Sequence, residues 1–104
     1  MIKKSSALEE ALAMQLKAAG IKHYREYAFA PPRKWRVDFL LPKMWCVEVE
    51  GAVWVQGRHT RGSGFIKDME KYNALAEKGY HLLRYSMAEI KSGAALAQIE
   101  RMLA

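Results

Sequence analysis

Three short segments with the composition of β-strands lie close together in the first half of the chain, and their spacing strongly constrains the fold. They occupy residues 23–29, 35–41 and 45–50, with the sequences HYREYAF, WRVDFLL and WCVEVE. Two prolines interrupt the chain after the first segment, and Pro42 with Lys43 makes a turn after the second. Connections this short cannot contain a crossover helix, so we expect an antiparallel meander.

A segment with helical periodicity precedes this meander. Residues 6–19 repeat apolar side chains every three or four positions. Ser6 followed by Glu9 has the form of a capping box, and Gly20 is a natural stop. We therefore expect the chain to begin with a helix packed on the sheet.

The second half of the chain alternates helix and strand. Residues 65–78 have helical spacing, 80–85 resemble a strand, and 86–103 form a last helix that Gly93 bends or interrupts. The side chains expected on the inner face of the helix at 65–78 are Phe65, Met69, Tyr72 and Leu75 or Ala76. The strand at 80–85 returns after a helical crossover, which favours parallel pairing with an earlier strand. The predicted order is αβββαβα, an α/β fold with a four-stranded mixed sheet flanked by helices.

Length and charge narrow the class of protein. The 104 residues suit one domain over residues 1–104, and 17 Lys and Arg residues give a formal net charge of +6, which favours nucleic acid as a partner. Cys46 is the single cysteine and lies in an apolar run, as expected of a buried free thiol in a reducing compartment. No signal peptide or membrane-spanning run is evident, so we expect a soluble, cytoplasmic protein.

Three carboxylates lie within strands that are otherwise apolar. Asp38 is part of WRVDFLL, and Glu48 and Glu50 are part of WCVEVEG. Glu48 and Glu50 are two residues apart and share a sheet face with Cys46, and Asp38 on the preceding strand can face them. Their mutual repulsion would be relieved by a hard cation, so these three residues are the predicted ligands of Mg²⁺ or Mn²⁺.

Each carboxylate taken alone has a simpler interpretation, which stays open. Asp38 could pair with Arg36 or Lys34 at a strand edge. Glu48 or Glu50 could lie on a solvated face of an edge strand. The occurrence of all three on adjacent strands before a glycine favours the metal site.

At these residues the sequence resembles the PD-(D/E)XK superfamily of restriction-endonuclease-like nucleases, over nearly the whole chain. In that family an acidic residue on one strand is followed by an acid-x-Lys pair on the next, and Asp38 and Glu48 match the two acids. The order of elements also matches. The similarity is closest to small phage or prophage nucleases and to the very-short-patch-repair endonuclease branch. The residues that match this branch are Glu48-Val49-Glu50-Gly51, His59, Asp68 and Leu83-Arg84.

The sequence departs from the family pattern at Glu50, where the family has a lysine that orients water and stabilises the transition state. The resemblance therefore implies a replacement cation, with Lys67, Lys71 or His59 as candidates. It also implies that Glu9 approaches the metal, although a capping box explains Glu9 equally well. Asp68 and Lys71 fit either a surface ion pair or the active site.

The segment after Glu50 is rich in glycine and basic residues. His59 within it could act as a general acid or base, whereas the alternative is a surface loop with incidental charge; the adjacent carboxylate strand favours the first. Trp54 is the tryptophan best suited to stacking on bases. The side chains predicted to contact DNA are Arg33, Lys34, Arg36, Trp54, Arg58, Arg61 and Lys67.

The sequence therefore predicts a Mg²⁺- or Mn²⁺-dependent DNA endonuclease with Asp38, Glu48, Glu50, Glu9, His59 and Lys71 in its active site. So small a chain has little room for sequence reading, which favours recognition of DNA structure or weak sequence specificity. A homodimer would allow both strands to be cut, and RNA remains open as a substrate. Two rival interpretations are a non-catalytic nucleic-acid-binding module on the same fold and a structural subunit whose carboxylates pair with Arg36 or Arg84.

Overall fold

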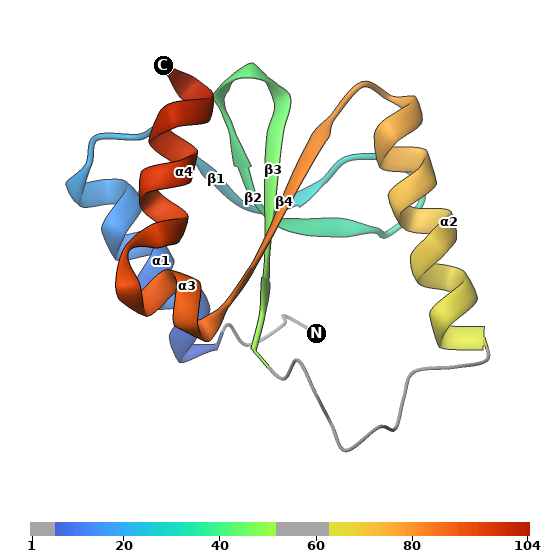
Figure 1. Ribbon diagram of the computed structural model, residues 1–104. Coiled ribbons are helices and arrows are strands. Elements are labelled where there is room, and N and C mark those ends of the chain that lie inside the picture. Colours follow the sequence, from blue (N-terminus) through green and yellow to red (C-terminus); the bar gives the residue numbers. More distant parts are fainter. Residues whose placement is uncertain (1–5, 52–62) are drawn as a thin grey trace.

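A four-stranded mixed sheet organises the chain in this computed structural model, which describes residues 6–51 and 63–104 (Figure 1). The strands are β1 (Tyr24–Ala28), β2 (Arg36–Leu41), β3 (Trp45–Glu50) and β4 (His81–Ser86), in the spatial order β1-β2-β3-β4. β2 pairs antiparallel with both β1 and β3, and β4 pairs parallel with β3. The predicted meander and the predicted parallel return are both confirmed.

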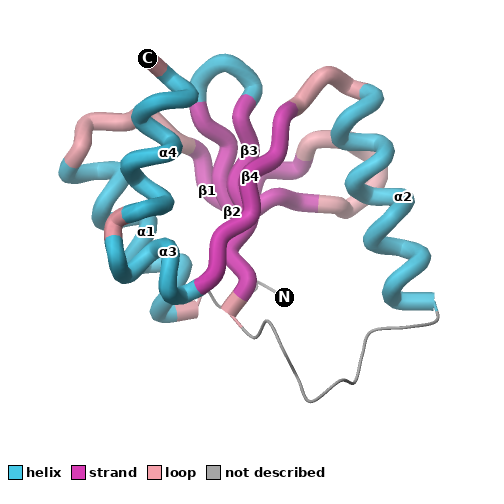
Figure 2. The backbone as a smooth tube through the Cα atoms, in the orientation of Figure 1, coloured by secondary structure: helices cyan, strands magenta, loops and turns pink. Residues whose placement is uncertain are grey.

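Helices cover both faces of the sheet (Figure 2). They are α1 (Ala7–Ala18), α2 (Ser63–Glu77), α3 (Met87–Ser92) and α4 (Ala94–Leu103). α1, α3 and α4 lie on one face, and α2 lies on the other as the crossover from β3 to β4. The predicted fold class, a mixed sheet flanked by helices, is confirmed. Within the described ranges, no helix has the length and apolar character needed to cross a membrane.

Local sequence explains where the helices begin and end. The Ser6 hydroxyl accepts a hydrogen bond from the Glu9 N–H at 3.0 Å, which satisfies a free donor of the first turn of α1. Gly20 follows the last turn with a φ of 73°. Gly93 has a φ of 89° and separates α3 from α4, so the interruption expected there is confirmed.

The alternating sequence of β3 separates two cores. Val47 is fully buried in the core beneath α1, α3 and α4, together with Phe39, Leu12 and Ile99. Cys46 is fully buried in the second core, beneath α2. Glu48 and Glu50 follow Cys46 at intervals of two, so their side chains point toward α2, as their spacing predicts.

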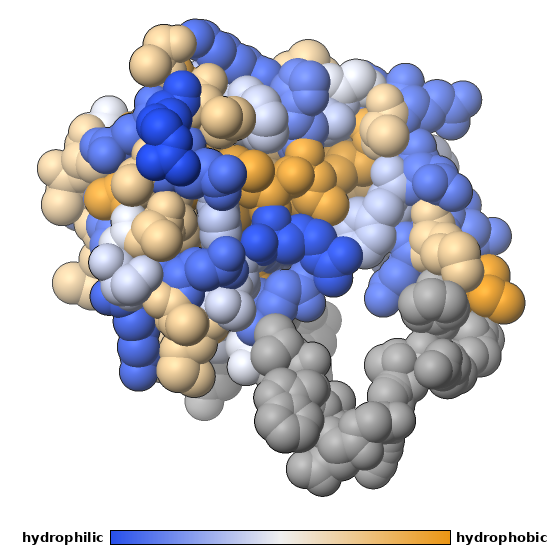
Figure 3. Space-filling model, in the orientation of Figure 1, coloured by the Kyte–Doolittle hydropathy of each residue, from blue (hydrophilic) through white to orange (hydrophobic). Residues whose placement is uncertain are grey.

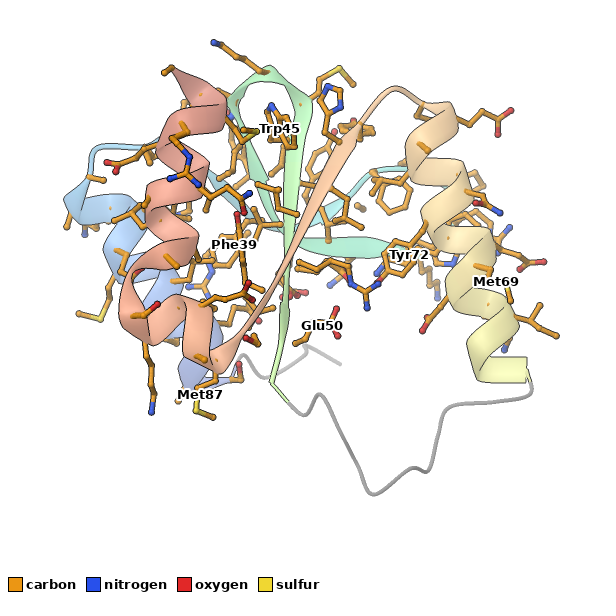
Figure 4. The ribbon with its side chains drawn as sticks, in the orientation of Figure 1. Phe39, Trp45, Glu50, Met69, Tyr72 and Met87 are labelled. Carbon is orange, nitrogen blue, oxygen red and sulfur yellow. The ribbon has the colours of Figure 1, made fainter. Side chains whose placement is uncertain are left out.

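One expectation about α2 is wrong. Helical spacing predicts Met69 on the inner face of the helix, but it is 46% exposed and lies on the outer side of α2 (Figure 4). The core beneath α2 contains Leu75 and Tyr72, both from the second half of the helix. Met69 lies in the first half of the helix, outside that core. The side chain of Phe65, also expected on the inner face, lies outside the described residues.

The sheet divides where β2 and β3 separate. Their pairing ends at Phe39 with Val47, whereas β3 stays paired with β4 as far as Glu50. Beyond Phe39, β2 follows β1 away from β3 (Figure 1). Asp38 is the first residue of β2 past this fork, so the fold opens the sheet beside a carboxylate.

Candidate functional site

Asp38 is nearly buried at the fork between β2 and β3, with 8% of its surface exposed. Its Oδ2 accepts a hydrogen bond from the backbone N–H of Val49 at 2.8 Å. A hydrogen bond to a side chain thus takes the place of a backbone hydrogen bond between β2 and β3. This bond fixes the Asp38 carboxylate to the strand that carries Glu48 and Glu50. Burial of an ionised carboxylate is costly without such hydrogen bonds or a nearby cation.

Three carboxylates from three elements converge beside this fork. Glu9 of α1, Glu26 of β1 and Asp38 of β2 each offer one oxygen, and these oxygens all lie within 4.8 Å of one another. Glu9 is 3% exposed and Glu26 is half-buried. Three oxygen donors this close match the ligand type and spacing that a hard divalent cation prefers.

An unusual backbone conformation accompanies Glu26 at this position. Glu26 has a φ of 50°, which is uncommon for a residue with a side chain. It falls in β1 between the paired residues Arg25 and Tyr27, so in register it stands opposite Asp38. Such strain is often found at functional sites, where surrounding structure holds a side chain in place.

The environment of Glu9 favours its protonated form. Burial raises the pKa of Glu9 to about 7, and its hydrogen bond with Glu26 and the charge of Asp38 act in the same direction. Arg25 lowers the pKa of Glu9, because its guanidinium lies 3.3 Å from the Glu9 carboxylate. The same guanidinium lies 2.7 Å from the Glu10 carboxylate. Arg25 is thus shared between Glu9 of this group and the exposed Glu10.

Glu48 belongs to a second polar group, between the sheet and α2. It is 8% exposed, and its Oε2 lies 3.0 Å from the Lys71 ammonium. Its Oε1 accepts a hydrogen bond from the Tyr72 hydroxyl. Burial and this hydrogen bond raise the pKa of Tyr72 above its ordinary value, so the phenol remains a donor at neutral pH.

Glu50 extends the same group to β4. Its Oε2 lies 2.8 Å from Nε of Arg84, and this pair is more exposed than the pair of Glu48 with Lys71. The Arg84 guanidinium and the Lys71 ammonium lie 5.2 Å and 5.3 Å from the centre of the Tyr72 ring. Figure 4 shows Tyr72 directed from α2 toward the strands and Glu50 at the lower end of β3.

The predicted metal ligands are thus divided between two neighbouring groups. Asp38 lies with Glu9 and Glu26, whereas Glu48 and Glu50 are neutralised by cations from α2 and β4. The ion pair that the rival interpretation expects of Arg84 is present with Glu50. Of the candidate replacement cations on α2, Lys71 contacts a site carboxylate and Lys67 is exposed.

The predicted DNA contacts that the structure describes lie outside these groups. Arg33, Lys34, Arg36 and Lys67 are exposed, whereas Trp54, Arg58, His59 and Arg61 fall outside the described residues. The Arg33 guanidinium lies 3.7 Å from the centre of the Trp35 ring, which stacks on Phe29. Hydrophilic side chains also gather across the middle of the face drawn in Figure 3, beneath an apolar patch between α4 and α2.

Comparison with known proteins identifies a solved structure with this fold, the catalytic domain of the homing endonuclease I-Bth0305I. The two share 24% sequence identity with a TM-score of 0.67, over 93% of this chain and 92% of that chain. No family model matches the chain, and no curated protein matches it either. The likeness establishes that the two chains share one fold along nearly their whole length.

Sequence reasoning did not identify Glu26, and it assigned Tyr72 to the core. A signal for Glu26 was present, because it is an acid inside the aromatic strand HYREYAF, like the acids of β2 and β3. Tyr72 gave no signal, since a tyrosine at helical spacing is an ordinary core residue. Its contact with Glu48 depends on how α2 packs on the sheet.

Proposed function

We propose that this chain is a metal-dependent nuclease that hydrolyses phosphodiester bonds in DNA. The observation that carries the proposal is the group of carboxylates Glu9, Glu26 and Asp38 at the fork of the sheet. The likeness in fold between this chain and an endonuclease catalytic domain supports the same function. The net charge of +6 supports a polyanionic substrate.

The donor set fits a hard divalent cation. The three residues supply only carboxylate oxygens, which suit Mg²⁺ or Mn²⁺ better than softer metals. Asp38 is common to this group and to the set predicted from sequence, in which Glu48 and Glu50 complete the site. We propose Asp38 as the central ligand, with Glu9 and Glu26 beside it and Glu48 on the neighbouring strand.

The surrounding residues have separable functions in this proposal. A bound divalent cation would polarise the scissile phosphate and lower the pKa of a water molecule. Val49 holds Asp38 through its N–H, and Lys71 on α2 supplies the positive charge that the family takes from a lysine at the position of Glu50. His59 remains a proposed general acid or base.

Exposed basic residues would bind the phosphate backbone beside the site. Within the described ranges, Arg33, Lys34 and Arg36 form no ion pair, whereas Arg25, Lys71 and Arg84 are paired with glutamates. Unpaired cations are available for phosphate contacts, which add affinity without reading sequence. Lys67, Arg58, Arg61 and Trp54 are further proposed contacts, and we expect selection of DNA structure, with RNA as a second possible substrate.

The proposed unit is one nuclease domain over residues 1–104, acting in the cytoplasm. A homodimer would place two sites on one duplex and permit cleavage of both strands. An alternative function is a non-catalytic nucleic-acid-binding module. The observation that favours it is Glu50, which stands at the position of the family lysine and pairs with Arg84 at 2.8 Å.

A cleavage assay tests the proposal directly. Purified protein would be incubated with labelled linear, nicked, single-stranded and four-way-junction DNA, and with an RNA duplex, in Mg²⁺, Mn²⁺ or EDTA. We expect metal-dependent cleavage that Asp38→Asn lowers by about two orders of magnitude and Glu48→Ala abolishes, while both variants remain folded. DNA shifted in a gel but never cut would select the binding module. Full activity of either folded variant would remove that residue from the mechanism.

A further inference from the structure

Both oxygens of Glu48 are occupied by groups of the protein itself. Tyr72 donates a hydrogen bond to Oε1, and the Lys71 ammonium lies 3.0 Å from Oε2. The Lys71 side chain is 17% exposed and that of Glu48 is 11% exposed, so the pair is only partly screened by water. Lys71 therefore stands where another cation approaching this oxygen would have to bind.

The two contacts of Glu48 differ in how easily they can be released. The Tyr72 ring is part of the core beneath α2, and its hydroxyl stays protonated. Lys71 reaches Glu48 with a flexible four-carbon chain that ends in a compact charge, and it can turn to water without disturbing the core. Tyr72 thus fixes one oxygen, while the contact at the other oxygen is exchangeable.

Glu48 also lies beside the carboxylates of the proposed metal site. The pairing of β2 with β3 ends at Phe39 and Val47, so Asp38 and Glu48 are the residues of the two strands that follow the last pair. The next residue of β3, Val49, donates its N–H to Asp38. A divalent cation at Asp38 would therefore lie near Lys71, and two positive charges at this spacing disfavour each other.

We propose that Lys71 competes with the divalent cation for Glu48, holding this carboxylate in the metal-free protein and leaving it when the metal binds. The inference rests on the proposed function. The released ammonium would then be free to contact a substrate phosphate. Such coupling is reciprocal: the contact of Lys71 with Glu48 weakens metal binding by the same free energy by which bound metal weakens that contact. Removing Lys71 from Glu48 should therefore strengthen metal binding by this free energy.

The test is a calorimetric titration of the full chain with Mn²⁺ in the absence of DNA. Lys71→Met should bind Mn²⁺ roughly five-fold more tightly than the unsubstituted protein, the upper range for an ion pair near the surface. Lys71→Arg keeps the charge and should restore the original affinity. Lys67→Met is the matched control, because Lys67 is one turn earlier on α2 and exposed, and it should change the affinity less. Equal or weaker binding by Lys71→Met would overturn the proposal.

A second measurement, by NMR, follows Lys71 in the protein that keeps this residue and its charge. In protein labelled with ¹³C-lysine, the Cε signal of Lys71, assigned by its absence from Lys71→Arg, should shift when Mg²⁺ is added, whereas that of Lys67 should not. A stationary Lys71 signal during Mg²⁺ binding would contradict release. If the unsubstituted protein binds no metal, both the proposed function and this inference fail. Metal binding that Lys71 does not influence defeats the inference alone.

Discussion

The backbone N–H of Val49 donates a hydrogen bond to Oδ2 of Asp38 at 2.8 Å, across the point where β2 and β3 separate. The bond satisfies an N–H that has lost its partner strand and fixes a buried carboxylate in one position. It leaves Oδ1 of Asp38 for other partners, since each carboxylate oxygen accepts independently. The separation of β2 and β3 thus leaves the Val49 N–H to bind Asp38, and this hydrogen bond fixes the position of the Asp38 carboxylate.

Asp38→Asn should separate the charge of this residue from its structural contact. The amide oxygen can still accept from Val49, so the fold should remain, while the loss of charge weakens metal binding. We expect cleavage to fall by about two orders of magnitude, or about 2.7 kcal/mol of transition-state stabilisation. Initial cleavage rates at saturating Mg²⁺, with circular dichroism as the check on folding, would measure this.

Asp38→Ala is the companion variant, because it removes the acceptor as well as the charge. The Val49 N–H would then be buried without this partner, at a cost of about 1–3 kcal/mol in the free energy of unfolding. Urea denaturation of the two variants would give the difference. Equal stability of Asp38→Ala and Asp38→Asn would show that the hydrogen bond contributes nothing to the fold.

The raised pKa of Glu9 predicts how stability depends on pH in the absence of metal. The pKa of Glu9 is about 7 in the folded protein, against an ordinary value of 4.5, so the folded state binds this proton more tightly. The free energy of unfolding should therefore fall as pH rises from about 4.5 to about 7. At about 1.4 kcal/mol per pKa unit, the loss is on the order of 3 kcal/mol.

Thermal unfolding in EDTA at several pH values would measure this dependence. Glu9→Gln is neutral throughout and should flatten the curve between pH 5 and 7. Adding Mg²⁺ should also stabilise the unsubstituted protein more at pH 8 than at pH 6, because the proton and the metal compete for Glu9. A Glu9→Gln variant with an unchanged pH profile would show that another group titrates.

Arg33 should contribute to DNA binding through a phosphate contact. Its guanidinium is held 3.7 Å from the centre of the Trp35 ring, which positions its donors before substrate arrives. Arg33→Gln should weaken binding and lower the slope of log K against log salt concentration by about one. Lys17→Gln is the control, because Lys17 is in the last turn of α1, at the opposite end from Glu9. Equal effects of the two variants would mean that only net charge matters.

Cys46 should be chemically inert in the folded protein. It is fully buried beneath α2, and burial raises the pKa of its thiol to about 12. An aromatic disulfide reagent should therefore label it only at the rate of unfolding, and fully in denaturant. Cys46→Val should cost about 1–3 kcal/mol of stability, since valine adds roughly one methylene to a fully buried site. Rapid labelling under native conditions would place the thiol at the surface.

Much of the architecture could be predicted because it follows from local patterns in the sequence. Alternation in β3 assigns Cys46 and Val47 to opposite cores, and Gly93 marks the division of the last helix. The short connection at Pro42 requires β2 and β3 to be antiparallel. Asp38 and Glu48 were identifiable because a carboxylate in an apolar strand needs a compensating partner.

The grouping of the site residues could not be predicted in the same way. Glu26 joins Asp38 through strand register and a positive φ, and neither is apparent in the spacing of HYREYAF. Met69 has helical spacing but is exposed, because α2 packs on the core through residues of its second half. Such outcomes depend on residues far apart in the chain.

The sequence by itself determined the order of the elements, the two faces of β3 and the presence of buried acids. Only the tertiary structure decided which basic side chain pairs with which carboxylate: Lys71 with Glu48, and Arg84 with Glu50. Periodicity fixes the face on which a side chain lies, since it follows from backbone geometry. The rotation and position of α2 on the sheet follow instead from the packing of Leu75 and Tyr72, which no local pattern contains.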